Sequence, residues 1–189
     1  MIDHRNGPDQ TEATGPRVAI FIDGSNLYHA LEENCRRTDL SFSGFIQRLL
    51  RGRTLLRTYY YNILQDSRRK PQAYWQQQKF LSILYSTPYL EVRLGRSAYR
   101  RGVAIEKGVD IRLATDMLEL AWRNLYETAI LVSGDGDFAY AVQTVKNIGK
   151  FVEVACFESN QSRDLLEASD AIIALTPEFF EGLWVGSSN

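Results

Sequence analysis

Short apolar runs alternate with amphipathic stretches along most of the chain. Apolar runs bounded by turn residues predict strands at 17–23, 54–64, 89–93, 128–134 and 150–157. Apolar residues at helical spacing predict helices at 25–34, 41–50, 67–86, 109–125, 137–147 and 163–168. Residues 94–106 are expected to form a basic loop or hairpin, and residues 170–175 to end the core. This alternation predicts an α/β fold with a central, mainly parallel sheet and helices on both faces, a three-layer α/β/α sandwich.

The length and composition fit one domain. A chain of 189 residues with 44% apolar composition can bury a core of ordinary size. We expect a disordered arm at 1–16, a single domain at 17–182 and a C-terminal tail at 183–189. No apolar stretch reaches the roughly 18–20 residues of a membrane span, and residues 1–15 lack the pattern of a secretory signal. A cytoplasmic protein without membrane contact is therefore expected.

The scarcity of cysteine and histidine limits the chemistry. Cys35 and Cys156 are the two cysteines, which excludes a disulfide framework or a cysteine-rich zinc module. His4 and His29 are the two histidines, too few for a histidine-based metal site, and they leave no room for a Ser-His-Asp triad in the core. Carboxylates remain as the candidate chemical groups.

The formal net charge of −1 hides a strong segregation along the chain. Residues 1–35 carry 2 basic and 6 acidic residues (−4), residues 36–107 carry 15 and 4 (+11), and residues 108–189 carry 5 and 13 (−8). Such asymmetry is expected when one surface meets phosphate and another part concentrates carboxylates. The basic section also contains eleven aromatic residues, and aromatics among arginines suit stacking on single-stranded bases. A solvated basic face over an aromatic core is the alternative.

Four aspartates are predicted to meet at one edge of the sheet. Asp23 ends the first strand, and Asp135 and Asp137 directly follow the strand at 128–134. Ligands of open α/β sheets bind at the carboxyl ends of the strands. On a helical projection of 109–125, Asp110 lies at the centre of the apolar face and Asp116 at its margin, so Asp116 is expected at the surface edge. An inward-facing carboxylate is costly unless it is paired or bound to a metal.

Each aspartate also has a purely structural interpretation. Asp23 with Gly24 can form a turn, Asp110 can interact with free amides of the first helical turn, and Asp135 and Asp137 can cap a loop. The convergence of all four is harder to explain in this way.

Aspartate oxygens without His or Cys select a hard cation, Mg²⁺ or Mn²⁺. Such an ion lowers the pKa of a bound water and stabilises charge developing on a phosphodiester. We expect the four aspartates to coordinate it and one of them to accept the proton of the attacking water. Asn26 is placed to orient a carboxylate or bind a phosphate oxygen, and Ser25 and Ser133 have the same opportunity.

Four blocks occur in order along the chain: VAIFIDGSNLYHAL, KGVDIRLATDML, LVSGDGDF and SRDLLEASDAIIAL. Together they resemble the NYN domain of the LabA/DUF88 group, relatives of PIN-domain nucleases, over about residues 17–176. The resemblance implies a PIN-like (Rossmannoid) sandwich and metal-dependent ribonuclease chemistry. It carries the family's acidic positions to the four aspartates, its asparagine to Asn26 and its basic residue to Lys107. Ser162 and Asp170 match the last block, where a structural and a functional role both stay open.

The resulting hypothesis is an Mg²⁺- or Mn²⁺-dependent endoribonuclease. The alternative is a catalytically weak or inactive RNA-binding or regulatory module on the same fold. RNA is the expected partner, bound through Arg96, Arg100, Arg101 and Lys107. The oligomeric state stays open. PIN-domain relatives commonly form dimers, and a homodimer of this chain would match them.

Two other enzyme classes fit less well. Gly134, Gly136 and Ala139 with Glu153 come close to the fingerprint of a dinucleotide site. The intervening aspartates would face the pyrophosphate, so no dinucleotide cofactor is expected. A phosphatase with Asp23 as nucleophile would need an aspartate two residues later, where this chain has Ser25.

Reversing the charge of Arg100 and Arg101 together, to glutamate, should weaken RNA binding and flatten its salt dependence. Each lost phosphate contact on a single strand should lower the slope of log K against log salt by roughly 0.7. Titration of a labelled RNA over a salt series measures this slope, and an unchanged slope would remove the loop from the interface.

Overall fold

The computed structural model describes residues 15–100 and 103–186, with backbone alone for 96–100 and 103–107. Within this part of the chain, one seven-stranded sheet has the order β4-β3-β2-β1-β5-β6-β7. All neighbouring pairs are parallel except β3 and β4. The strands are β1 (Arg17–Asp23), β2 (Thr54–Leu64), β3 (Leu90–Arg100), β4 (Val103–Lys107), β5 (Thr128–Val132), β6 (Phe151–Cys156) and β7 (Ala171–Ala174).

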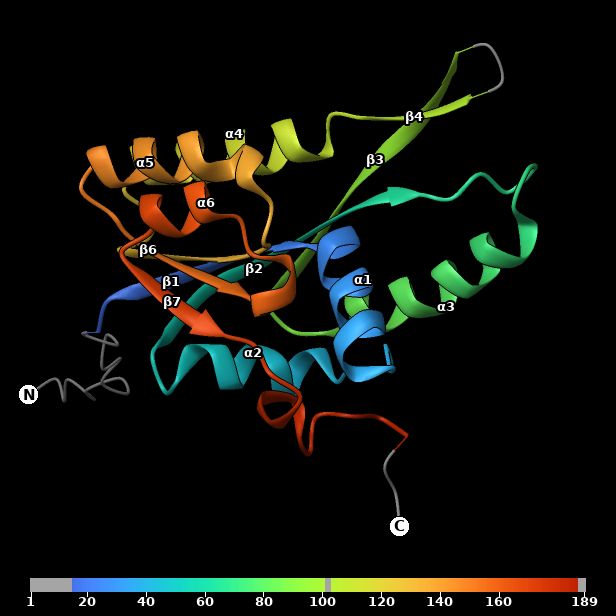
Figure 1. Cartoon of the computed structure of the whole chain (residues 1–189), viewed down its shortest axis with the longest axis horizontal. Helices are drawn as coiled ribbons and strands as arrows, with labels where there is room; N and C mark the ends of the chain where they lie inside the picture. Colours follow the sequence, from blue (N-terminus) through green and yellow to red (C-terminus); the bar gives the residue numbers. More distant parts are fainter. Residues whose placement is uncertain (1–14, 101–102, 187–189) are drawn as a thin grey trace, which may run out of the picture.

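Helices cover both faces of the sheet (Figure 1). One face carries α1 (Gly24–Cys35), α2 (Phe42–Leu50) and α3 (Pro71–Ser86). The other carries α4 (Val109–Trp122), α5 (Ala139–Asn147) and α6 (Arg163–Ala168). Short 3-10 turns occupy Gly136–Phe138, Glu158–Asn160 and Glu178–Phe180. The predicted three-layer α/β/α sandwich with a mainly parallel sheet is therefore confirmed.

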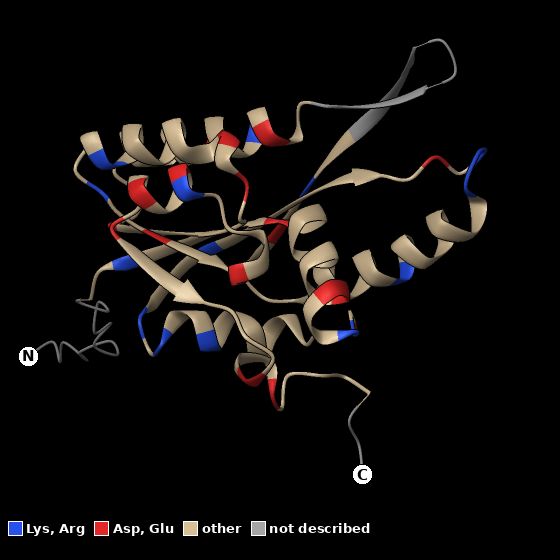
Figure 2. Ribbon diagram, viewed as in Figure 1, with Lys and Arg blue, Asp and Glu red and all other residues tan. Residues whose placement is uncertain are grey.

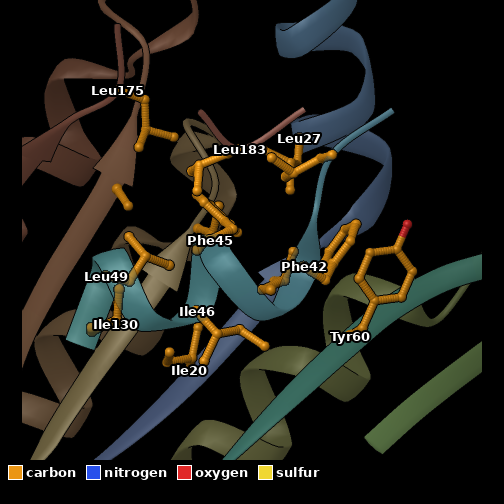
Figure 3. Packing of buried hydrophobic residues seen from close by; sticks show 14 of the residues in the cluster. Ile20, Leu27, Phe42, Phe45, Ile46, Leu49, Tyr60, Ile130, Leu175 and Leu183 are labelled. Atoms are coloured by element: carbon orange, nitrogen blue, oxygen red, sulfur yellow. The ribbon is translucent and has the colours of Figure 1, made fainter. Parts of the chain in front are cut away.

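The central strand β1 is buried on both faces, which explains its unbroken apolar sequence. Val18, Ile20 and Ile22 face the α1–α3 layer, whereas Ala19 and Phe21 face the α4–α6 layer, and all five are fully buried. In Figure 3 the α2 side chains Phe45, Ile46 and Leu49 pack over Ile20 and its neighbour Ile130. The position of the end of β1 is thus set by packing from both sides.

Several boundaries differ from the sequence-based expectation. The region 94–106 forms the hairpin of β3 and β4, so β3 is longer than the predicted 89–93. Helix α3 begins at Pro71 and not at 67, because proline suits the first helical position, where no amide donor is required. Residues 183–186 of the expected tail lie against the domain, where Leu183 is buried and Trp184 pairs with Leu40. Residues 1–14 of the expected arm and 187–189 lie outside the described residues.

The basic section of the chain does not form one continuous positive face in the described residues. Figure 2 shows basic positions of this section on α2, on the turn before α3 and on α3 itself. Several of these cations are paired internally: Arg53 with Glu153 at 2.8 Å, Arg93 with Asp116, and Arg37 with Asp39 at 2.7 Å. No helix in the described ranges is long and apolar enough to cross a bilayer.

Gly24 lets β2 lie unusually close to the start of α1. A Cβ at this position would collide with the ring and hydroxyl of Tyr60 and lie 2.7 Å from the carbonyl oxygen of Tyr61. The backbone of Tyr61 and the buried ring of Tyr60 cannot move without disturbing the sheet. Glycine after Asp23 therefore serves close packing between α1 and β2.

Gly24→Ala should destabilise the protein by about 2 kcal/mol or more, because the added methyl group overpacks a rigid site. Gly15→Ala is the control, since its Cβ would meet Thr54 at an ordinary 3.7 Å. Urea denaturation of both variants measures the difference. Equal free energies of unfolding for the two variants would show that β2 can move away from α1 at little energetic cost.

Candidate functional site

The site lies at the point where the order of the strands reverses. From β1 the chain builds β2 and β3 on one side, and it later builds β5, β6 and β7 on the other. Ligands of open α/β sheets bind in the crevice at the carboxyl ends of the strands flanking such a point. In this protein those strands are β1 and β5, which end at Asp23 and just before Ser133.

Asp23 is a buried carboxylate held by two hydrogen bonds. It is 6% exposed, it caps α1 by accepting the Asn26 amide at 3.1 Å, and it accepts the Ser133 hydroxyl at 3.2 Å. Burial, together with the negative charges of Asp110 and Asp135, raises the pKa of Asp23 to about 6 against the opposing effect of the two hydrogen bonds. The carboxylate is therefore costly to ionise in the folded protein.

Asp110 does not lie at the centre of the buried face of α4, so that prediction is wrong. The buried stripe runs through Leu113, Met117 and Leu120, whereas Asp110 is exposed and Ile111 is 73% exposed. The apolar arc of this helix is wider than the stripe that the sheet covers, and the sequence pattern does not say which part is covered. Asp110 nevertheless acts on Asp23, because its charge raises the pKa of that carboxyl and both residues line a small cavity of about 50 Å³.

The turn after β5 brings Asp135 to the same edge. The Ser133 hydroxyl donates to Asp23 and accepts the amide of Asp135 at 3.2 Å. Asp135 in turn accepts the amide of Asp137 at 3.0 Å and caps the short 3-10 turn. Asp137 is exposed. Asp110 and Asp135 thus each lie within electrostatic reach of Asp23, and Asp137 lies beside Asp135 on the turn.

Asn26 ties three segments of this edge together. Its side-chain oxygen accepts the Gly134 amide at 3.1 Å and the side-chain amide of Asn160 at 3.0 Å. The side chain of Asn26 therefore orients the backbone of the turn, whereas its backbone amide orients the Asp23 carboxylate. No sequence signal pointed to Asn160, whose own side-chain oxygen is buried without a hydrogen bond in the described residues.

Gly134 and Gly136 allow the segment of Asn160 to approach the turn. A Cβ on Gly134 would collide with the Asn160 carbonyl, and one on Gly136 would lie 2.5 Å from the Ser162 hydroxyl oxygen. The Ser162 amide donates to the Gly134 carbonyl at 2.9 Å. The glycine spacing that resembled a dinucleotide fingerprint is thus used in packing one loop on another, and Ser162 contributes to that packing.

Asp116 and Asp170 are engaged in structural pairs. The sequence pattern predicts Asp116 at the surface edge of α4, but it is partly buried. There it accepts the Tyr61 hydroxyl at 2.9 Å and pairs with Arg93. Asp170 accepts the Val152 amide at 2.8 Å and pairs with Lys146 at 3.2 Å, at the start of β7. Ser25 lines the small cavity beside Asp23.

The predicted RNA-binding residues lie on the β3–β4 hairpin. Arg96 and Lys107 are partners in the strand register at its base, and Arg100 is near its tip. The side chains of these three, and Arg101 as a whole, lie outside the described residues. The base of the hairpin leads through Gly108 directly into α4 and Asp110.

The donor set suits a hard cation with a large share of water ligands. Among the described residues, no group of three His, Cys, Asp or Glu side chains is arranged to hold a metal ion, so coordination by all four aspartates stays a prediction. Mg²⁺ commonly binds through one or two carboxylates and keeps several waters. The cavity lined by Asp23 and Asp110 offers such carboxylates, and a cation there would offset the repulsion that raises the pKa of Asp23.

The chain is similar to a known domain family, to a named protein and to a solved structure. The profile of the family described as NYN domain matches residues 17–176. The low amplitude and bright protein LabA of Synechococcus elongatus is 27% identical over 173 residues, covering 84% of this chain and 83% of the relative. A crystal structure of a protein of unknown function from Vibrio parahaemolyticus has a TM-score of 0.72 at 24% identity, covering 91% of this chain and 99% of that one.

Asp23→Asn should stabilise the metal-free protein near neutral pH by about 2 kcal/mol. The folded pKa of about 6 lies above the ordinary value near 3.9, so the ionised carboxylate destabilises the fold at neutral pH. Wild-type stability therefore rises as the pH falls from 7 through 6 toward 4, and the advantage of asparagine shrinks with it. Asparagine also remains a good helix cap.

Urea denaturation in EDTA near pH 7 and near pH 5 measures this effect. Asp137→Asn, an exposed position on the same edge, is the matched control and should change stability little. A wild-type protein more stable than Asp23→Asn at both pH values would mean that burial of this charge is fully compensated.

Proposed function

The chain belongs to the NYN domain family of the PIN-like nuclease superfamily, and on this premise we propose that it is a ribonuclease that hydrolyses RNA phosphodiester bonds with Mg²⁺ or Mn²⁺. The observation that carries the proposal is the buried Asp23 carboxylate at the switch point of the sheet, with Asp110 and Asp135 close enough to raise its pKa. Strongly perturbed carboxylates in a cleft are typical of functional sites.

In this proposal the cation binds beside Asp23 through one or two of the carboxylates of Asp23, Asp110 and Asp135 and otherwise through water, with Asp137 next to them. The bound ion would lower the pKa of a water and stabilise the charge developing on the phosphate. Asp23 is held in one orientation by the Asn26 amide and the Ser133 hydroxyl. A more exposed carboxylate, Asp135 or Asp110, is better placed to accept the proton of the attacking water, because it has access to solvent.

The remaining residues of the edge orient the turn and attract the substrate. Asn26 fixes the Gly134 amide, so that the turn carrying Asp135 keeps its place relative to Asp23. We call the edge of the sheet that carries Asp23, Asp110 and Asp135 the acidic edge. Lys107 and Arg96 lie at the base of the hairpin that leads into α4, and their positive charge would favour a phosphate bound near this edge. Because the hydrogen bonds of Asn26 and Ser133 already hold the turn beside Asp23, the carboxylates would need little backbone movement to meet a cation.

An RNA-binding or regulatory module on the same fold is the second candidate. It is favoured by one observation, that no three acidic side chains of the described residues are arranged to hold a metal ion. Such a module would keep the basic hairpin and the packed turn without turnover. Metal dependence of cleavage discriminates between the two.

The wild-type protein should cleave RNA in Mn²⁺ or Mg²⁺, and EDTA should stop the reaction. Asp23→Asn or Asp135→Asn should reduce the rate by about a hundredfold or more, since each weakens the acidic site for the cation that would stabilise the transition state, while RNA binding is largely kept. Cleavage of labelled RNAs on denaturing gels measures the rate, and fluorescence anisotropy measures binding.

Glu119→Gln, nine residues beyond Asp110 on the exposed side of α4, is the control and should cleave like wild type. Binding of RNA without metal-dependent cleavage, over single-stranded and structured substrates, would favour the binding module. Equal loss in Glu119→Gln would mean that the effect is not specific to the acidic edge.

A further inference from the structure

A second, larger cavity of about 550 Å³ opens next to the acidic edge. It lies between α1, the start of α2, the end of β2 and one face of α3. The α3 residues that line it, Ala73, Gln76, Gln77 and Phe80, follow helical spacing and so form one stripe. Its volume is within the range of about 300–1,000 Å³ that is typical of small-molecule sites.

Helix α3 is held over this cavity by its buried residues Leu81 and Leu84 and by hydrogen bonds of one side chain. Gln77 donates to the Ile63 carbonyl at 2.7 Å and accepts the Gln65 amide at 2.8 Å, which attaches the helix to the end of β2. Helices and β2 form most of the cavity wall. A preformed site loses less entropy when it binds a ligand.

One wall of the cavity is aromatic. Phe42, Tyr60 and Phe80 contact one another edge to face, with ring centroids 5.5–5.7 Å apart. Figure 3 shows Tyr60 at the margin of the core with its hydroxyl directed away from Phe42. This hydroxyl accepts the Asn62 amide at 2.9 Å, which leaves its own proton available to a ligand. The wall thus combines planar apolar surface with a buried donor.

The rest of the lining includes several polar groups and, among the residues that the structure describes, no acidic side chain. Gln65 and Gln76 offer amide groups that can both donate and accept, and Lys70 supplies a positive charge at the rim. A ligand that fits would be planar, would carry donors and acceptors on its edge, and would bring negative charge. A nucleobase attached to a phosphate has these three properties.

The two cavities share residues. Ser25 and Asn62 line both, and Gly24 at the larger cavity directly follows Asp23. A base in the larger cavity would therefore place a neighbouring phosphate beside Asp23 and Asp110. This continuity links recognition of a base to the acidic edge.

We infer that the larger cavity binds one unpaired base of an RNA strand and so makes single-stranded RNA the substrate of the acidic edge. The inference deepens the proposed ribonuclease function and rests on it. A base inside a duplex is paired and stacked, and it cannot enter a pocket without being extruded at a cost of a few kcal/mol. The protein should therefore prefer unpaired segments over duplex RNA.

Ala73→Phe tests the inference by filling the cavity from the α3 side. The probe is a short dye-labelled single-stranded RNA, titrated in EDTA so that it is not cleaved. Base–aromatic stacking is strong enough that the variant should bind it about tenfold or more weakly. Gln72→Phe is the matched control, because it adds the same side chain at an exposed neighbour that does not line the cavity.

A scan of the same RNA with a single abasic nucleotide gives a second measurement. When the abasic nucleotide stands at the position that enters the cavity, wild type should lose about as much affinity as Ala73→Phe loses for the intact RNA. The affinity of Ala73→Phe should not change when the same nucleotide is made abasic. Thermal melts establish that both variants are folded. Wild-type affinity in folded Ala73→Phe, or no sensitivity of wild type to any abasic position, would overturn the inference.

Cleavage in Mn²⁺ separates this outcome from failure of the proposed function. Normal cleavage by Ala73→Phe would overturn the base pocket and leave the ribonuclease proposal standing. The opposite outcome is a wild-type protein that cleaves no RNA but whose binding depends on a base and is weakened by Ala73→Phe. This outcome would support the base pocket and count against the ribonuclease proposal.

Discussion

The burial of the Asp23 carboxylate is the constraint on which this edge of the sheet depends. Strand β1 contributes five fully buried apolar residues and then an aspartate that is 6% exposed. An amide and a hydroxyl satisfy its oxygens, and in the described part of the chain no arginine or lysine hydrogen-bonds to it. The pKa of Asp23 therefore rises, and the neighbouring aspartates raise it further. A destabilising carboxylate kept inside a packed fold is typical of a functional site.

Asp116 shows how the same protein treats a carboxylate that serves structure. It is partly buried, like Asp23, but Arg93 pairs with it and the Tyr61 hydroxyl donates to it. Arg93 also lies over the ring of Tyr59 at 4.4 Å, which holds the guanidinium in place. Asp116 is thus neutralised by a fixed cation, whereas the charges that act on Asp23 are those of Asp110 and Asp135. The same chain therefore contains both an internal ion pair and a buried carboxylate beside like charges.

The acidic edge and the larger cavity are two parts of one crevice. Asn26 holds the turn of Asp135 on one side of Asp23, and Gly24 brings Tyr60 close on the other. Ser25 and Asn62 contribute to both spaces. Because packed helices and strands form these walls, the distance between a bound base and the carboxylates would be set by the fold. In the proposed function, recognition of a base and cleavage of the neighbouring phosphodiester would both depend on the same few contacts around β1.

The sequence by itself determined the order of strands and helices, the parallel sheet and the arrival of Asp23 and Asp135 at one edge, because these follow from apolar periodicity and the rule for parallel strands. Only the tertiary structure decided which stripe of α4 is covered, and hence that Asp110 is exposed and Asp116 is paired. It also decided that Asn26 binds Gly134 and Asn160, and that α3 closes a cavity over β2. Periodicity is local along the chain, whereas these contacts join residues more than a hundred positions apart or depend on where a whole helix packs.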